Sequence, residues 1–476
     1  MLKKWGLFIG PVLFLILSLL SGDIISPQAD AVLAVALWMI IWWVSEAVHI
    51  AVTALLPLLL FPLLNVAEMQ EVSQHYGNPI IFLFFGGFVM ALALQKVNLH
   101  RRIALNIVKL TGTSPERVIL GFMIATAFMS MWISNTASTV VMLPIALSVI
   151  QLLIDDEDGF TKKDKNFALN MMLGIAIAAN AGGIATIIGT PPNSVLIALL
   201  ESEYQIEISF FQWMQFGLPF SFVFVGLAYL VLVKWIFPCK GIQFSRSAAL
   251  IREEIKNLGN MTRHEKQVAI IFIITVALWI SRGFIQKALP NLAINDTLIS
   301  ICGAIAMFAI PASFKKPQFI LDWKDTEKLS WGILLLFGGG LALASGMKSS
   351  GIVDLVTNAI AASNWSIYLI VTLLILLMIF MTELMSNVAL VTVLAPVIAG
   401  IAIGIDIPLL QLLIPITMAA SCAFMLPMAT PPNAIVFASG HVKVSQMAKI
   451  GFILNIIAVI LLMLYYLFVI PLFFGE

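Results

Sequence analysis

Charged residues are scarce in this sequence. They make up 11% of its 476 residues, whereas 61% are hydrophobic and the mean hydropathy is +1.03. Soluble domains carry about 25% charged residues, so the composition excludes an ordinary soluble protein and predicts an integral membrane protein. A net charge of only +1 also argues against a nucleic-acid partner, because such proteins carry clusters of basic residues.

Cysteine is rare as well. The chain has three cysteines, Cys239, Cys302 and Cys422, and none has a second cysteine or a histidine at the spacing of a metal site. The sequence therefore predicts neither a disulfide framework nor a zinc site. It also lacks the Ser-His, Asp-Asp and zinc patterns of intramembrane or soluble hydrolases, so we expect a protein that is not an enzyme.

Apolar runs long enough to cross about 30 Å of hydrocarbon extend almost from end to end. Uninterrupted runs lie near residues 6–21, 30–48, 49–64, 79–96, 208–236, 267–285, 295–313, 331–347 and 446–473. Ser-Asn pairs interrupt two further blocks, 118–153 and 366–404, and Thr-Pro-Pro-Asn interrupts another two, 167–200 and 408–439. If the first two are re-entrant helical hairpins and the other two are broken helices that still span, this all-α polytopic protein has about eleven transmembrane helices plus two hairpins.

The positions of lysine and arginine test this arrangement. With the N-terminus in the cytoplasm, every basic residue except Arg282, Lys287 and Lys348 falls on the inner side, as the positive-inside rule requires. Counting either hairpin as a full crossing would spoil that bias. We therefore expect a multi-pass protein of the inner (cytoplasmic) membrane, with the N-terminus in the cytoplasm and the C-terminus outside.

An internal repeat supports the same layout. Three landmarks recur 252 residues later in the chain: Phe85-Gly86-Gly87 as Phe337-Gly338-Gly339, Ser134-Asn135 as Ser386-Asn387, and Pro144 as Pro396. A fourth recurs 240 residues later: Thr190-Pro191-Pro192-Asn193 as Thr430-Pro431-Pro432-Asn433. One hairpin would enter from inside and the other from outside, so the two copies have inverted topologies. Inverted repeats with paired broken helices are typical of secondary transporters and not of channels.

The interruptions place uncharged polar groups inside lipid. Non-helical backbone survives there only where protein or water covers it, and two adjacent prolines cannot continue a helix. Unwinding at both Thr-Pro-Pro-Asn motifs would free carbonyls, which suit a small cation, and amides, which suit an anion. Neither hairpin tip and neither break contains Lys or Arg. An anion there would be held by neutral donors, helix ends and bound cations.

Several segments resemble one transporter family. These are WISNTAST, LMSNVALV, GTPPN, ATPPN and WWVSEAVHIAVTALLPLLLFP, which together are similar to the divalent anion/sodium symporter family, a family that includes Na⁺-coupled dicarboxylate and citrate carriers. The resemblance covers nearly the whole chain. It implies Na⁺-coupled symport of C4 dicarboxylates such as succinate, malate or fumarate, with Na⁺ as the coupling ion and no organic cofactor. A dicarboxylate exchanger, or a carrier of citrate or sulfate, remains an alternative.

The resemblance also implies a domain organisation. Family members are homodimers in which a transport domain moves past a scaffold like an elevator. The expected parts are N-terminal scaffold helices (1–78), a first repeat (79–237), a cytoplasmic linker (238–266), further scaffold helices (267–330) and a second repeat (331–476). The hairpins and broken helices of the two repeats would form the mobile domain.

The same resemblance assigns the site residues. The first cation site would use Ser134, Asn135 and the backbone at Gly189, with Ser130 as a further ligand, and its pseudo-symmetric mate would use Thr382, Asn387 and the backbone at Met385 and Ala429. Substrate carboxylates would contact Asn135, Thr136, Ser386, Asn387, and Thr190 or Thr430. Val388 stands where the first motif has Thr136, so the two carboxylate sites are expected to be unequal.

Three further residues near the tips have other interpretations. Ser138 and Thr139 are expected to satisfy the hairpin backbone. Glu383 is either a hydrogen-bonding prop for the second hairpin or a direct contact of the cation, and the sequence leaves that choice open.

Overall fold

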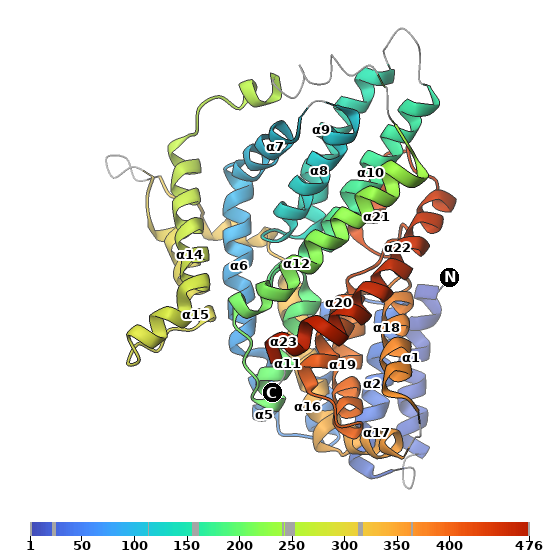
Figure 1. The fold of residues 1–476 in the computed structure, drawn as a ribbon. Helices are drawn as coiled ribbons and strands as arrows, with labels where there is room; N and C mark the ends of the chain where they lie inside the picture. Colours follow the sequence, from blue (N-terminus) through green and yellow to red (C-terminus); the bar gives the residue numbers. More distant parts are fainter. Residues whose placement is uncertain are drawn as a thin grey trace.

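The helical character of the chain follows directly from its apolar runs. The computed structural model describes residues 2–20, 25–112, 114–154, 161–239, 242, 253–312, 318–362 and 365–474, and within these ranges it has helices and no β-strand. The all-α class is thus confirmed (Figure 1). Seven helical stretches in the described ranges are long and apolar enough to cross a membrane: Pro27–Ser45, Met69–Lys96, Phe210–Ile236, Arg263–Ala288, Trp331–Ser349, Asn387–Gly404 and Val444–Phe473.

The N-terminal helices form a separate hydrophobic cluster. They are α1 (Leu2–Leu20), α2 (Pro27–Ser45), α3 (Ile50–Thr53), α4 (Leu56–Leu63) and α5 (Met69–Tyr76). The start of α2 is set by local chemistry, because Ser26 Oγ accepts the Ala29 amide at 3.1 Å and Pro27 occupies the first helical position. Their buried side chains pack against the first helix of the second repeat, α16 (Trp331–Ser349), and against residues of helices Ile352–Ala361 and Asn387–Gly404.

The two repeats contain the same elements in the same order, and the second ends with one further short helix. The first consists of α6 (Pro79–Lys96), α7 (Leu99–Thr111), α8 (Pro115–Ser130), α9 (Asn135–Ile154), α10 (Lys162–Gly183), α11 (Pro191–Tyr204), α12 (Phe210–Tyr229) and a π-helical segment (Leu230–Ile236). The second consists of α16, α17 (Ile352–Ala361), α18 (Ile367–Met381), α19 (Asn387–Gly404), α20 (Leu409–Ala420), α21 (Pro431–Ala438), α22 (Val444–Leu464), a π-helical segment (Tyr465–Val469) and α23 (Ile470–Phe474). In Figure 1, α7 to α9 lie toward the upper end of the molecule and α17 and α19 toward the lower end.

The structural repeat extends beyond the sequence motifs. The last long helix of each copy lies directly against the break of the preceding broken helix, at Gly217 in α12 and at Gly451 in α22. A Cβ atom at Gly217 would lie 2.8 Å from the Ile184 carbonyl oxygen, and one at Gly451 would lie 2.4 Å from the Phe424 carbonyl oxygen. Only glycine permits so close an approach, so these two positions support the breaks from behind.

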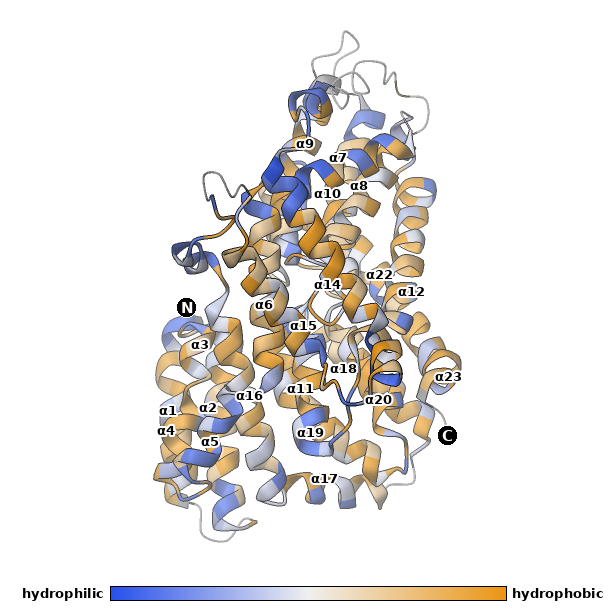
Figure 2. Cartoon of the chain, turned by 90° about the vertical axis from the view of Figure 1, so that its left-hand side faces the viewer, coloured by the Kyte–Doolittle hydropathy of each residue, from blue (hydrophilic) through white to orange (hydrophobic). Residues whose placement is uncertain are grey.

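A helix pair connects the repeats on one side of the molecule. It consists of α14 (Arg263–Ala288) and α15 (Asp296–Ala309), and a short 3₁₀ helix (Trp323–Lys328) follows it. In Figure 1 this pair lies on the side opposite α1 and α2, and α15 packs against α6. Hydrophobic residues run along most helices, and hydrophilic residues gather at the upper end near α7 and the start of α10 (Figure 2). Much of the expected linker 238–266 lies outside the described residues.

Candidate functional site

The first hairpin tip brings three oxygen atoms together. Helix α8 ends at Ser130 and α9 begins at Asn135, so the Ser-Asn pair lies where the turn enters α9. Ser130 is fully buried, and its Oγ lies 2.6 Å from Asn135 Oδ1 and 2.7 Å from the carbonyl oxygen of Ala179 in α10. One hydroxyl hydrogen serves at most one of these acceptors well. The cluster is therefore rich in oxygen and poor in hydrogen, as a cation site requires.

The same Asn135 oxygen faces the first break. A Cβ atom at Gly183 would lie 2.5 Å from Asn135 Oδ1 and 3.1 Å from the Gly189 carbonyl oxygen. These two oxygens thus lie against the same face of Gly183, closer than any residue with a side chain would permit. Hydroxyl, amide and backbone oxygens suit a hard cation, so the predicted set of Ser130, Asn135 and Gly189 fits Na⁺.

The second hairpin repeats this geometry. Thr382 Oγ1 lies 2.6 Å from Asn387 Oδ1 and 2.5 Å from the Ala420 carbonyl oxygen. Thr382 stands where the first copy has Ser130, and Ala420 at the end of α20 stands where it has Ala179 near the end of α10. The two sites are therefore built from the same chemical groups on corresponding elements.

Each break is closed by an asparagine that follows the proline pair. Its side-chain amide faces carbonyls of its own break: for Asn193 those of Gly183, Ile184 and Thr186 at 3.3, 3.3 and 2.8 Å, and for Asn433 those of Ala423 and Leu426 at 3.2 and 3.0 Å. Sequence reasoning noticed these asparagines in the repeated motif but gave them no role. Their bonds shape the carbonyls of the unwound segments.

The hairpins and broken helices interlock across the repeats. Helix α9 of the first hairpin packs against α21 of the second broken helix, and α19 packs against α11 of the first. Thr190 and Thr430 are the N-cap residues directly before α11 and α21, and both are buried. Both threonines therefore stand at the amide ends of half-helices, where an anion is favoured.

The remaining predicted residues are placed less tightly. Ser134 is exposed, and its Oγ accepts the Ala137 amide at 3.2 Å, so it caps α9. Four others, Thr136, Met385, Ser386 and Ala429, are half-buried near the tips and the second break, and within the described ranges no side-chain hydrogen bond joins them to the other candidates. The expectation for Ser138 and Thr139 is confirmed, since both hydroxyls donate to the Asn135 carbonyl at 2.9 Å.

The contacts of Glu383 are those of a residue that supports the second hairpin by hydrogen bonds. Its buried carboxylate accepts the backbone N–H groups of Phe424, Met425 and Leu426 at 2.7, 2.9 and 3.1 Å, and the side-chain amide of Asn455 at 2.9 Å. Donors alone surround it in these contacts, which matches the acceptor-only chemistry of a carboxylate. Glu383 therefore fastens the second hairpin to the second break.

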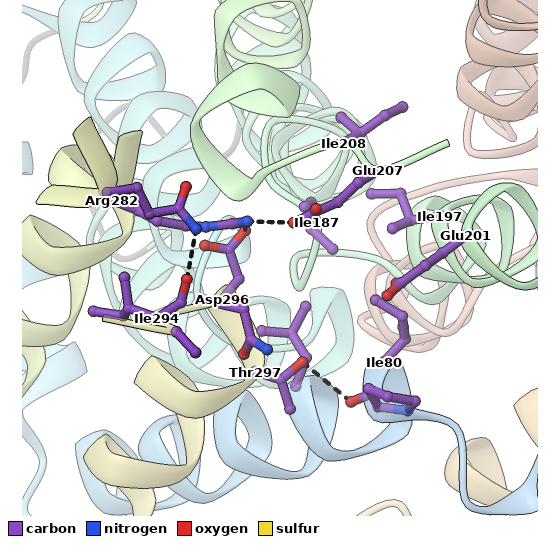
Figure 3. A pocket seen from close by; sticks show the side chains of 15 residues that line it. Ile80, Ile187, Ile197, Glu201, Glu207, Ile208, Arg282, Ile294, Asp296 and Thr297 are labelled. Carbon is purple, nitrogen blue, oxygen red and sulfur yellow. Dashed lines mark hydrogen bonds and ion pairs between the residues drawn. The ribbon is translucent and has the colours of Figure 1, made fainter. Parts of the chain in front are cut away.

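A separate cavity of about 290 Å³ lies among α6, α11, α14 and α15. Its apolar walls include Ile80, Ile187, Ile197 and Ile208, and its charged groups largely face one another (Figure 3). Arg282 pairs with Glu207 and, at 3.2 Å, with Asp296, whose carboxylate also accepts the Phe210 amide at 2.7 Å. These pairings indicate a structural contact between elements and not a second substrate site.

Comparison with known proteins decides the family. The family described as "Sodium:sulfate symporter transmembrane region" matches residues 2–474. The chain belongs to this family. It is 40% identical over 472 residues to the sodium-dependent dicarboxylate transporter SdcS of Staphylococcus saprophyticus, covering 98% of this chain and 91% of that protein. It is also 40% identical over 476 residues to the transporter of the same name in Staphylococcus aureus, covering 99% and 92%.

Two solved structures share the fold at low identity. The YdaH transporter of Alcanivorax borkumensis aligns with a TM-score of 0.59 and 14% identity, covering 84% of this chain and 88% of that one. MtrF of Neisseria gonorrhoeae aligns with a TM-score of 0.53 and 12% identity, covering 84% and 83%. The resemblance inferred from the motifs to a divalent anion/sodium symporter is confirmed by the family match, and the protein is a transporter and not an enzyme.

Proposed function

We propose that the protein couples Na⁺ to the import of C4 dicarboxylates such as succinate, malate or fumarate across the cytoplasmic membrane. The observation that carries the proposal is the matched pair of oxygen clusters, Ser130 with Asn135 and Thr382 with Asn387. Each cluster lies beside a break in a neighbouring helix. The names of the relatives, sodium-dependent dicarboxylate transporters, support both the ion and the substrate class.

The proposed coupling is electrostatic and local. Na⁺ at the first site would be held by Ser130, Ser134, Asn135 and the Gly189 carbonyl, and at the second by Thr382, Asn387 and the carbonyls of Met385 and Ala429. The substrate's two negative charges meet no Lys or Arg in the tips or breaks, so bound Na⁺ supplies the compensating charge. Each ligand then raises the affinity of the other by the same factor.

The substrate carboxylates would lie between the hairpin tips and the half-helix ends. Their proposed donors are the hydroxyl and amide groups of Asn135, Thr136, Ser386, Asn387, Thr190 and Thr430. Asn135 and Asn387 belong to both sets, with the amide oxygen on the cation and the amide N–H on the anion. This shared use of one side chain is the physical basis of symport in the proposal.

We further propose the wider organisation expected from the resemblance. Residues 1–78 and 267–330 would form the scaffold of a homodimer, and the hairpins and broken helices of 79–237 and 331–476 would form a domain that moves as an elevator. Eleven spanning helices and two re-entrant hairpins place the N-terminus in the cytoplasm and the C-terminus outside. The N-terminal helices α1 to α5 share a hydrophobic cluster of their own, which also includes residues of α16, α17 and α19 of the second repeat.

Uptake into proteoliposomes tests the proposal. An inward Na⁺ gradient should drive accumulation of radiolabelled succinate, and the gradient-driven rate should fall at least about tenfold in Ser130→Ala, because a buried hydroxyl ligand is lost. Ser148→Ala is the control for loss of a serine hydroxyl outside the site, since the exposed Ser148 donates to the Pro144 carbonyl of its own helix at 2.9 Å. A succinate uptake rate that does not change with the Na⁺ gradient would overturn the proposed coupling. Exchange that is stimulated by succinate on the opposite side without Na⁺ would favour an exchanger.

A further inference from the structure

Asn180 joins the first repeat to the break of the second. It lies in α10, is 1% exposed, and its Nδ2 lies 3.0 Å from Thr430 Oγ1, 3.1 Å from the Ala423 carbonyl oxygen and 3.4 Å from Asn433 Oδ1. All three acceptors belong to the second broken helix. One side chain of the first repeat thus holds the segment in which a proposed substrate contact, Thr430, is located.

This contact fixes the direction of the Thr430 hydroxyl group. Besides the Asn180 amide, Thr430 Oγ1 accepts the Asn433 backbone N–H at 3.4 Å, the capping bond of α21. A hydroxyl has two acceptor lone pairs and one hydrogen. With N–H donors on both lone pairs, the hydrogen points away from them, and no residue in the described ranges accepts it. That hydrogen is available to a carboxylate oxygen.

The matching threonine of the first break is not held in this way. Thr190 is also buried and directly precedes α11, but its side chain accepts no capping bond. By the 240-residue offset of the breaks Asn180 corresponds to Ala420, which has no side-chain donor. Ser421 is the residue that directly follows the alanine whose carbonyl faces the second hairpin hydroxyl, as Asn180 does in the first copy. Ser421 Oγ is buried and finds no hydrogen-bond partner among the described residues. The two threonines therefore differ in how firmly their hydroxyls are oriented.

We infer that Asn180 is a positioning residue that orients the Thr430 hydroxyl as a donor to one carboxylate of the substrate, and that the second break is consequently the stronger of the two carboxylate sites. The inference rests on the proposed function and deepens it. It assigns Asn180 a role through Thr430 and places no direct contact between Asn180 and the substrate.

A double-mutant cycle in proteoliposomes tests the inference, with succinate and saturating Na⁺. Asn180→Ala and Thr430→Val should each raise the succinate KM about tenfold, the loss expected for one hydrogen bond to a charged group, with little change in kcat. In the Thr430→Val background, Asn180→Ala should raise the succinate KM by no more than about a further twofold, because its effect depends on the Thr430 hydroxyl. In the matched Thr190→Val background, it should keep its full effect.

Other outcomes overturn the inference. One is that Asn180→Ala raises the succinate KM equally in the Thr430→Val and Thr190→Val backgrounds. Another is that Asn180→Ala lowers kcat and leaves KM unchanged. The third is that Thr190→Val raises the succinate KM more than Thr430→Val does. The comparison of Thr190→Val with Thr430→Val needs no Asn180 variant. It therefore tests which break holds the stronger carboxylate site even if Asn180→Ala does not fold. If the wild type takes up no succinate with Na⁺, the proposed function fails by itself. In that case, a double-mutant cycle on the unfolding temperature of the anion-free protein tests whether Asn180 contacts Thr430. Additive shifts of that temperature for Asn180→Ala and Thr430→Val would rule the contact out.

Discussion

Replacing Glu383 with glutamine should destabilise the protein measurably. The Glu383 carboxylate accepts four N–H groups at 2.7 to 3.1 Å, and one of its oxygens is the acceptor for the Leu426 amide. Glutamine has one acceptor oxygen, so an N–H of the break or of Asn455 would face another N–H instead. An orphaned buried donor costs about 1–3 kcal/mol, and the remaining bonds lose their charge assistance. We expect a total loss of about 2–5 kcal/mol.

Thermal unfolding of the detergent-solubilised protein measures this loss. At about 2 cal/mol/K per residue of unfolding entropy, a chain of 476 residues should unfold about 2–5 °C lower. The control is Glu46→Gln, because Glu46 is an exposed carboxylate whose partner Lys3 lies at 3.1 Å, and exposed pairs contribute about 1 kcal/mol or less. Asn455→Leu removes one donor but keeps the carboxylate, so its loss should be the smaller of the two. A Glu383→Gln variant as stable as Glu46→Gln would refute the reasoning.

Three other changes have expected outcomes. Asn135→Ala should raise both the succinate KM and the half-saturating Na⁺ concentration about tenfold or more, measured by uptake, and a normal Na⁺ response with weak succinate binding would contradict the shared-ligand proposal. Asp296→Asn should lower the free energy of unfolding by about 1–3 kcal/mol, because the buried Arg282 guanidinium loses the charged partner at 3.2 Å and keeps only Glu207; an unchanged melting temperature would count against this. Burial opposes ionisation of Asp325, but hydrogen bonds from Lys96 and the Asp322 amide outweigh it and hold the pKa of that carboxyl below its ordinary value. A lowered pKa stabilises above the unfolded pKa, about 4, and that contribution is lost as pH falls through the folded value. Lys96→Met should therefore cost up to about 1 kcal/mol near neutral pH and almost nothing in strong acid, and a cost independent of pH in melting curves would exclude the ion pair.

Much of the secondary structure could be predicted because lipid imposes a simple length and hydropathy rule. The run predicted near 331–347 is α16, Trp331–Ser349, and the Ser-Asn and Thr-Pro-Pro-Asn motifs fall at ends of helices. The matched helices α7 and α17 escaped prediction. Both are short and amphipathic, so a search for continuous apolar runs passes over them although their helical periodicity is present in the sequence.

The contacts within the site were harder to predict. The paired hydroxyls at Ser130 and Thr382 were expected from the resemblance, and they do face Asn135 and Asn387. The Asn180 contact with Thr430 joins residues 250 positions apart, and no local pattern encodes such a separation. The available signal was an asparagine within the apolar part of α10, and that helix holds a second buried asparagine, Asn170. The meaning of that signal depends on how the two repeats interlock.

The central claim is that neutral side chains at the two hairpin tips hold Na⁺ and a dicarboxylate together. Binding of succinate to the purified protein by titration calorimetry, at a series of Na⁺ concentrations balanced with K⁺, tests it most directly. The account predicts that Na⁺ tightens succinate binding and that succinate tightens Na⁺ binding by the same factor, and that Asn135→Ala abolishes this linkage. Succinate affinity that stays constant from K⁺ to Na⁺ would contradict it.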